Sequence, residues 1–140
     1  MAGSTGETSN ARFSPDGKNI GFCETDEISV VKCDGTHARR LIAGWSPAYS
    51  PDGSRIVFLG GRLGRQLRMM DSDGTNVSVV YEARSPISGP MFWPDAKCIL
   101  FVNEGLPNGT GEILRIDLKT RRLEPLISTD LPNVGENKRG

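Results

Sequence analysis

The chain has 140 residues, of which 36% are hydrophobic, and its 17 Lys and Arg side chains balance 17 Asp and Glu side chains. This length fits one domain that can bury a core, and the zero net charge gives no electrostatic reason to expect a nucleic acid, an anionic membrane or a polyanionic substrate. No apolar run reaches the ~20 residues of a membrane-spanning helix, so no membrane contact is expected.

Residues 1–10 are polar and lack the basic and apolar segments of a secretory signal. They predict a flexible lead-in and, for the sequence as written, a cytoplasmic location; a periplasmic location is the alternative if the chain belongs to an exported protein. The three cysteines, Cys23, Cys33 and Cys98, show neither the even number of a disulfide framework nor the close pairs of a zinc site. We expect free thiols.

A five-residue turn pattern opens each of three successive units. Its copies are Phe13 to Gly17, Tyr49 to Gly53 and the degenerate Phe92 to Ala96, which start 36 and 43 residues apart. A period of this size is typical of solenoids and propellers. Pro and Gly supply the backbone angles of a tight turn, and Asp accepts hydrogen bonds from its amides. Ala96 replaces Gly, and because a left-handed Ala costs about 1–2 kcal/mol, a different turn geometry is expected there.

Three more short apolar runs follow the turn in each unit, which predicts four antiparallel strands per unit. Pro125 lies in the last of these runs and cannot donate a hydrogen bond to a neighbouring strand, so that strand is expected at a sheet edge. Tandem four-stranded units predict an all-β protein made of propeller blades. The expected blades are residues 11–43, 47–81 and 90–127, followed by a tail at 128–140.

The repeat contains aromatic-Ser-Pro-Asp-Gly at 13–17 and 49–53, Ile-x-Phe at 20–22, 56–58 and 99–101, and Asp-x-Asp-Gly-Thr at 71–75. This combination resembles the TolB-type β-propeller repeat, which also occurs in the propellers of prolyl oligopeptidase-like peptidases. The resemblance covers residues 11–127 and implies half of a six-bladed β-propeller. It identifies a blade and not an activity, because one fold carries many functions.

The sequence offers no catalytic, cofactor-binding or metal-binding set. His37 is the single histidine, and a solvated side chain is expected just after a hairpin turn. No nucleophile motif accompanies it, and it cannot replace the several histidines that hold the metal in the TolB-like sugar lyases that the repeat resembles. Asp71 and Asp73 begin like a calcium loop, but an apolar strand follows where further ligands are needed, so a plain turn is expected. We therefore predict a protein that is not an enzyme.

The loops at 24–27, 60–66 and 103–112 vary in length and share one face of the blades, whereas the turns on the other face are short and uniform. Variable loops on a repeated scaffold usually carry binding specificity. The candidate partner-binding residues on that face are an aromatic, three cations and an apolar side chain, namely Trp45, Arg62, Arg65, Arg84 and Leu106. Trp45 fits equally well a packing role between the first two blades. The arginine clusters are expected to be solubilising charge rather than a nucleic-acid site.

The function favoured by these observations is a non-catalytic scaffold that binds a protein or peptide. The alternatives are a piece of a larger TolB-like protein, a propeller from a peptidase or lyase whose catalytic parts lie elsewhere, and a structural subunit whose one obligatory partner is itself. Three blades form only part of a ring, so we expect a homodimer that closes six blades. Phe13, Tyr49 and Phe92 are expected in equivalent buried positions.

Overall fold

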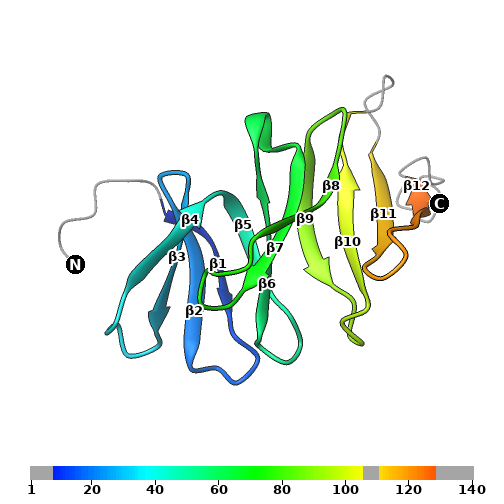
Figure 1. Cartoon of the computed structure of the whole chain (residues 1–140). Helices are drawn as coiled ribbons and strands as arrows, with labels where there is room; N and C mark the ends of the chain where they lie inside the picture. Colours follow the sequence, from blue (N-terminus) through cyan, green and yellow to red (C-terminus); the bar gives the residue numbers. More distant parts are fainter. Residues whose placement is uncertain (1–7, 106–110, 129–140) are drawn as a thin grey trace, which may run out of the picture.

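The computed structural model describes residues 8–105 and 111–128, which form three four-stranded antiparallel sheets (Figure 1). The first sheet contains β1 (Thr8–Phe13), β2 (Asn19–Glu24), β3 (Glu27–Lys32) and β4 (Arg39–Ala43). The second contains β5 (Trp45–Tyr49), β6 (Arg55–Gly60), β7 (Gln66–Asp71) and β8 (Ser78–Glu82), with the short 3-10 turn η1 (Arg62–Gly64) between β6 and β7. The third contains β9 (Ile87–Phe92), β10 (Cys98–Asn103), β11 (Glu112–Asp117) and β12 (Leu123–Ser128).

Each sheet holds four consecutive strands in sequence order, so each is one blade, and the predicted all-β architecture is confirmed. Blade one begins at Thr8, inside the expected lead-in, and blades two and three begin at Trp45 and Ile87, two to three residues before the expected limits. Pro125 lies in β12, an edge strand, as its missing amide hydrogen requires. Cys23, Cys33 and Cys98 are free thiols.

The blades stand side by side, with blade one at one end of the row and blade three at the other (Figure 1). The first strands of the blades lie next to one another, since β5 contacts both β1 and β9. The β2–β3 and β6–β7 loops lie at the upper side of the view, and the β1–β2, β5–β6 and β9–β10 turns lie at the lower side. The predicted division into a variable-loop face and a uniform-turn face is therefore present.

The core consists of two apolar clusters, one at each contact between blades. Side chains alternate between the two faces of a strand, so each blade points one set towards the blade before it and one towards the blade after it. In blade two, Ile56 and Phe58 face blade one, while Val57 and Leu67 face blade three. All four are completely buried. Burial in this fold is thus a property of the contact between two blades.

The Pro-Asp-Gly turns are held by side-chain hydrogen bonds within each repeat. The Ser14 hydroxyl donates to the Asp16 carboxylate (2.7 Å) and accepts from the Asn19 amide (3.0 Å). Ser50 makes the same two bonds in blade two. In blade three the Ala96 amide donates to the Trp93 carbonyl (2.8 Å), the same turn bond that Gly17 makes. Ala96 has φ 63°, so the expected change of turn geometry is wrong, and the hairpin keeps a left-handed alanine.

The prediction that Phe13, Tyr49 and Phe92 are all buried is wrong for Phe13. Tyr49 packs on the cluster between blades one and two, and Phe92 packs on the cluster between blades two and three. Both are half-buried, whereas Phe13 is 67% exposed. The aromatic ring at this position packs against the preceding blade, and the described residues supply no blade before the first.

Candidate variable-loop site

The variable-loop face is built from the three variable loops and the two connections between blades, and backbone hydrogen bonds tie each loop to a connection. The Gly44 amide donates to the Asp26 carbonyl (2.9 Å), which joins the β4–β5 connection to the β2–β3 turn. The Ala83 amide donates to the Arg65 carbonyl (2.9 Å) in the equivalent place between blades two and three. Farther along, the Glu104 amide donates to the Pro86 carbonyl (3.0 Å). Each bond extends the strand pairing of its own blade by one residue, so the variable loop of each blade is tied to the connection beside it.

The most distinctive of these loops contains η1. Gly61 begins it with φ 74°, and a Cβ at this position would lie 2.7 Å from the Gln66 side chain, so glycine is required. Leu63 follows with φ 60°, a left-handed conformation that costs a non-glycine residue about 1–2 kcal/mol. Its side chain is 66% exposed. The loop therefore presents an apolar side chain to solvent on a strained backbone.

Hydrogen bonds fix the base of the η1 loop. Arg68 Nε donates to Gln66 Oε1 (2.8 Å), and Gln66 Nε2 donates to Glu82 Oε1 (3.4 Å).

Arg65 is half-buried, and its Nε atom is buried without a hydrogen-bond partner in the described residues. Such an atom normally has a partner, because an unpaired buried donor is costly. The described residues therefore leave the Arg65 guanidinium incompletely satisfied.

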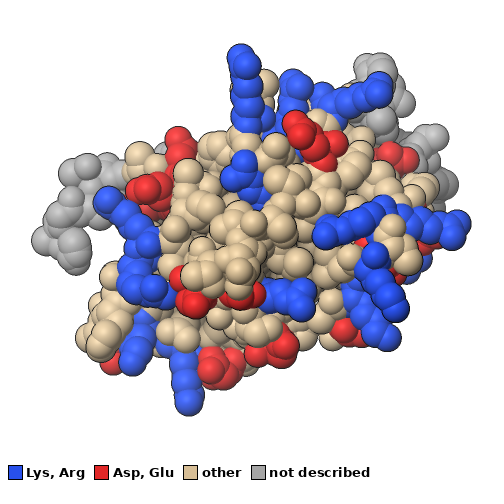
Figure 2. All heavy atoms as spheres, in the orientation of Figure 1, with Lys and Arg blue, Asp and Glu red and all other residues tan. Residues whose placement is uncertain are grey.

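Two exposed arginines lie in and beside the loop that carries the exposed leucine. Arg62 and Arg84 are both exposed, and within the described residues neither belongs to an ion pair. The Ala83–Arg65 bond brings the segment that carries Arg84 alongside the η1 loop. Figure 2 shows Lys and Arg side chains projecting from this upper side of the molecule. The surface combines an apolar side chain with free cations, which suits an apolar group that has a carboxylate close to it.

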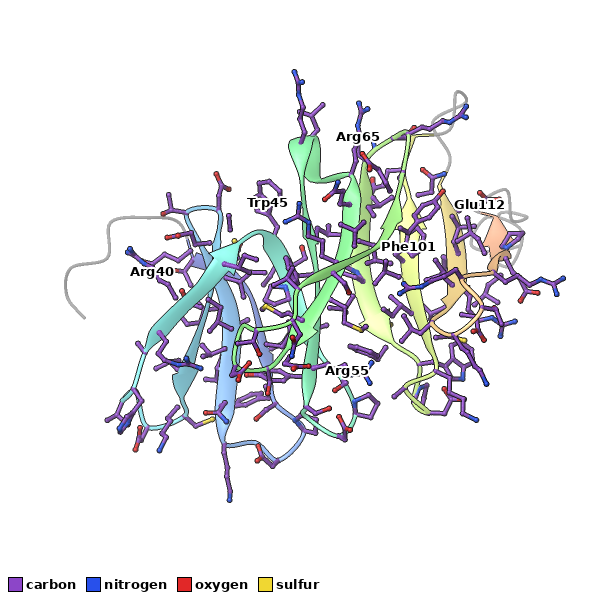
Figure 3. All side chains as sticks on the ribbon, viewed as in Figure 1. Arg40, Trp45, Arg55, Arg65, Phe101 and Glu112 are labelled. Atoms are coloured by element: carbon purple, nitrogen blue, oxygen red, sulfur yellow. The ribbon has the colours of Figure 1, made fainter. Side chains whose placement is uncertain are left out.

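Trp45 lies beneath this surface and joins two blades. Its indole Nε1 donates to the Asp26 carboxylate of blade one, and its ring lies 3.8 Å from the position that a Cβ would take at Gly64 of blade two. The indole also packs on the cluster between blades two and three. Figure 3 shows Trp45 and Arg65 in the upper half of the molecule and Arg55 in the lower half. The packing interpretation of Trp45 thus has direct contacts in its favour.

Of the residues predicted from the sequence, Trp45 and Arg65 lie on or under the variable-loop face in Figure 3. Arg62 lies in η1 on the same face, and Arg84 follows Ala83, which is bonded to Arg65. Leu106 lies outside the described residues. The sequence interpretation missed Leu63. The sequence does contain a pattern that indicates its exposure, because Leu63 lies between Arg62 and Gly64 in a loop without strand periodicity.

The other motifs form ordinary turns. The Asp73 carboxylate accepts from the Thr75 amide (3.0 Å), and Asp71 accepts from the Asn76 side chain (2.7 Å). His37 is exposed, and its ring nitrogen contacts the Thr36 hydroxyl (2.9 Å). In residues 8–105 and 111–128 there is no group of three or more His, Cys, Asp or Glu side chains placed to hold a metal ion. The same residues contain no helix long and apolar enough to cross a membrane.

Comparison with known proteins gives structural relatives but no sequence relative. No protein-family model and no curated protein matches the chain. A TolB structure from Agrobacterium tumefaciens superposes with a TM-score of 0.73 at 24% identity, over 83% of this chain and 47% of that one. A chain from the nidogen–laminin complex gives a TM-score of 0.75 at 13% identity, over 90% and 50%. The β-propeller domain of the Trilobed protease from Pyrococcus furiosus gives 0.66 at 16% identity, over 91% and 44%.

The fold is that of β-propeller blades. The predicted resemblance to TolB and peptidase propellers is confirmed at the level of fold, which is what identities below 25% establish. The chain spans about half the length of each of these similar chains. What those proteins bind or catalyse does not follow from the likeness.

Proposed function

We propose that this arc of three propeller blades, residues 8–128, is a non-catalytic binding module, and that its partner is a protein or peptide that contacts the variable-loop face. The observation that carries the proposal is Leu63, an exposed apolar side chain on left-handed backbone between two glycines of the same loop. Gly61 and Gly64 adopt positive φ at little cost, whereas Leu63 does so at a cost in stability. Strained and exposed residues cluster at binding sites, where the strain serves recognition.

The charges around Leu63 define the partner chemistry. Arg62 and Arg84 are exposed cations, and the buried Nε of Arg65 has no hydrogen-bond partner among residues 8–105 and 111–128. Arginine is enriched at interface hot spots and binds carboxylates through two parallel hydrogen bonds. The partner is therefore a segment with an apolar side chain followed or preceded by Asp or Glu. One similar chain comes from a complex of two proteins, nidogen and laminin, which supports a binding role for blades of this kind.

A peptide selection on the immobilised chain tests the proposal. Selected peptides should contain an apolar residue next to Asp or Glu, and Leu63→Asp or Arg62→Glu should weaken their binding at least ~10-fold, since hot-spot losses exceed about 1.4 kcal/mol. Matched substitutions on the uniform-turn face serve as controls. Val77 is an exposed apolar residue and Lys18 an exposed cation there, so Val77→Asp and Lys18→Glu should leave the affinity within about twofold.

Two results would contradict the loop-face proposal. One is that the wild-type chain selects no peptide above background. The other is that Val77→Asp and Lys18→Glu weaken binding as much as the loop-face variants do, which would place the contact elsewhere.

The second candidate function is that of a propeller belonging to a larger TolB-like protein or to a peptidase or lyase. The observation that favours it is that the chain spans only 44–50% of the similar chains, one of which is a protease propeller. A panel of peptidase and lyase substrates tests activity in the chain itself. Turnover that His37→Ala abolishes would support an enzyme, whereas the binding module should give no turnover above the rate without protein.

A further inference from the structure

The two ends of the arc expose residues that the repeat buries elsewhere. On the face towards the preceding blade, Phe58 of blade two and Phe101 of blade three are completely buried, whereas Phe22, their equivalent in blade one, is only half-buried. Ile20 is half-buried in the same way, although the equivalent Ile56 is completely buried. Phe13, opposite Ile20 in the β1–β2 pair, is 67% exposed. We call Phe13, Ile20 and Phe22 of blade one the leading face.

At the opposite end of the molecule, apolar side chains of blade three are also less buried than their equivalents in blade two. On the face towards the following blade, Leu67 of blade two is completely buried, whereas the equivalent Ile113 of blade three is half-buried. Leu126 is 41% exposed at the bulge position where Val80 of blade two is 7% exposed. Met91 is 52% exposed and lies opposite Leu100 in the β9–β10 pair. We call Met91, Leu100, Ile113 and Leu126 of blade three the trailing face.

The two internal contacts show what a leading face fits. Tyr49 of blade two places its ring carbon Cε2 3.4 Å from the position that a Cβ would take at Gly21 of blade one. Phe92 of blade three packs on the cluster that contains Val57 of blade two. The register of β2, β6 and β10 makes Gly21, Val57 and Leu100 equivalent positions. An aromatic in the position of Phe13 therefore packs against a residue in the position of Leu100.

We propose that the leading face of one copy docks on the trailing face of a second copy, at two equivalent seams, so that two arcs close one ring. The geometry makes Phe13 of each copy contact Leu100 of the other. A second copy is the occupant that fits, because the repeat makes both end faces equivalent to faces that already meet inside the chain. The leading face corresponds to the faces that blades two and three turn to the blade before them, and the trailing face corresponds to those that blades one and two turn to the next blade. Two arcs also match the length of one similar chain, since this chain spans 47% and 50% of two of them. Propellers close with about four to eight blades, which includes six.

The charged side chains at the trailing face do not oppose this docking. Glu124 lies opposite Arg115 in the β11–β12 pair. The Asp117 carboxylate, opposite Cys98, accepts hydrogen bonds from the Lys119 and Thr120 amides. Arg115 lies in β11 at the position of Met69 in blade two. It forms an ion pair with Glu124 and lies over the Trp93 ring at 5.7 Å. A paired charge stacked on an aromatic ring can be covered at a much smaller cost than a free one.

The mass of the wild-type particle gives the first test. Light scattering at micromolar concentration should give two chain masses of 15.2 kDa each. A folded particle of one chain mass would overturn the proposal, and so would filaments or a larger closed assembly, because a single pair of arcs leaves no free face.

A charge-swap experiment identifies the two faces. Phe13→Glu alone and Leu100→Lys alone should each place two charges in the seams of the pair and shift the particle from two chain masses to one. When the two variants are mixed, each mixed pair has one wild-type seam and one Glu–Lys seam, so the mixture should return to two chain masses. Restored pairing cannot follow from damage to the fold of either variant, which keeps the test informative if one of them folds poorly alone.

A control and a contrary outcome complete the design. Val79 is 48% exposed but lies on the outer strand β8 of the middle blade, so Val79→Asp should stay at two chain masses. If Leu100→Lys remains paired while Phe13→Glu does not, the leading faces meet each other and the proposed seam is wrong. This result would leave peptide binding at Leu63 untouched, so the two proposals fail separately.

Discussion

Single residues decide how well each turn of the repeat is made. Ser14 and Ser50 complete the hydrogen bonds of the first two hairpins, but the third has Trp93 at this position and Ala96 in place of glycine. Ala96 nevertheless adopts φ 63°. The sheet on both sides of the turn therefore imposes a conformation that the local sequence disfavours.

Replacing this strained alanine should stabilise the protein. Ala96→Gly removes a left-handed Ala that costs about 1–2 kcal/mol, partly offset by the greater freedom of glycine in the unfolded chain, so a gain of up to about 1 kcal/mol is expected. The reverse change is a matched control, because a Cβ at Gly17 would meet no atom within 4 Å and Gly17→Ala should cost a similar amount through backbone strain alone. Urea unfolding measures both. Equal stability of Ala96→Gly and wild type would show that the turn relaxes without strain.

The turn carboxylates make stability depend on pH. Hydrogen bonds from the Ser54 hydroxyl, the Ser54 amide and the Ser50 hydroxyl lower the pKa of Asp52 from 3.8 to about 2. Since the folded pKa lies below the unfolded one, the ionised group contributes stability above about pH 4 and loses it as the pH falls towards 2. The pKa values of Asp16, Asp34 and Asp73 are lowered by equivalent bonds.

Melting curves between about pH 6 and pH 2 check this expectation. The wild-type Tm should fall over the acidic end of the range, and Asp52→Asn should reduce the fall while lowering the Tm at neutral pH. A variant whose Tm changes with pH as steeply as that of the wild type would show that Asp52 does not contribute.

At the scale of elements, the blades are joined by a small number of polar contacts above the apolar clusters. The Trp45 indole binds the Asp26 carboxylate across blades one and two. The Ala83 amide donates to the Arg65 carbonyl and ties the connection that leads to blade three to the β6–β7 loop of blade two. These contacts fix the loops relative to one another. Hydrogen bonds therefore tie the variable-loop face to the blades, and its β6–β7 loop contains η1.

The contact between Trp45 and Asp26 can be separated from any role in binding. Trp45→Phe keeps an aromatic ring but removes the indole donor, so it should lower the free energy of unfolding by about 1 kcal/mol. Asp26 has φ 64°, which glycine adopts readily, and Asp26→Gly removes the acceptor and completes a double-mutant cycle. A coupling energy near zero would mean that the bond does not hold the blades together. Unchanged peptide affinity in Trp45→Phe would assign the indole to packing rather than to the partner.

For the whole molecule, the number of blades governs which side chains are buried. Phe58 and Phe101 each face a preceding blade and are completely buried, whereas Phe22 has no preceding blade among the described residues and is half-buried. Covering both ends by a second copy would give every blade two neighbours and would remove the exposed apolar residues at the ends, which soluble proteins rarely leave in large patches.

The sequence by itself determined the turns, the strands and the number of blades, because these depend on residues close together in the chain: Pro-Asp-Gly sets the hairpin, and alternation sets the strand. It also placed Trp45, Arg62, Arg65 and Arg84 on the variable-loop face. The exposure of Phe13, the bond from Trp45 to Asp26 and the left-handed Leu63 were decided only by the tertiary structure. The physical reason is that in a propeller the partner of each buried face belongs to another blade, some 40 residues away in this chain, so identical local patterns end in different environments.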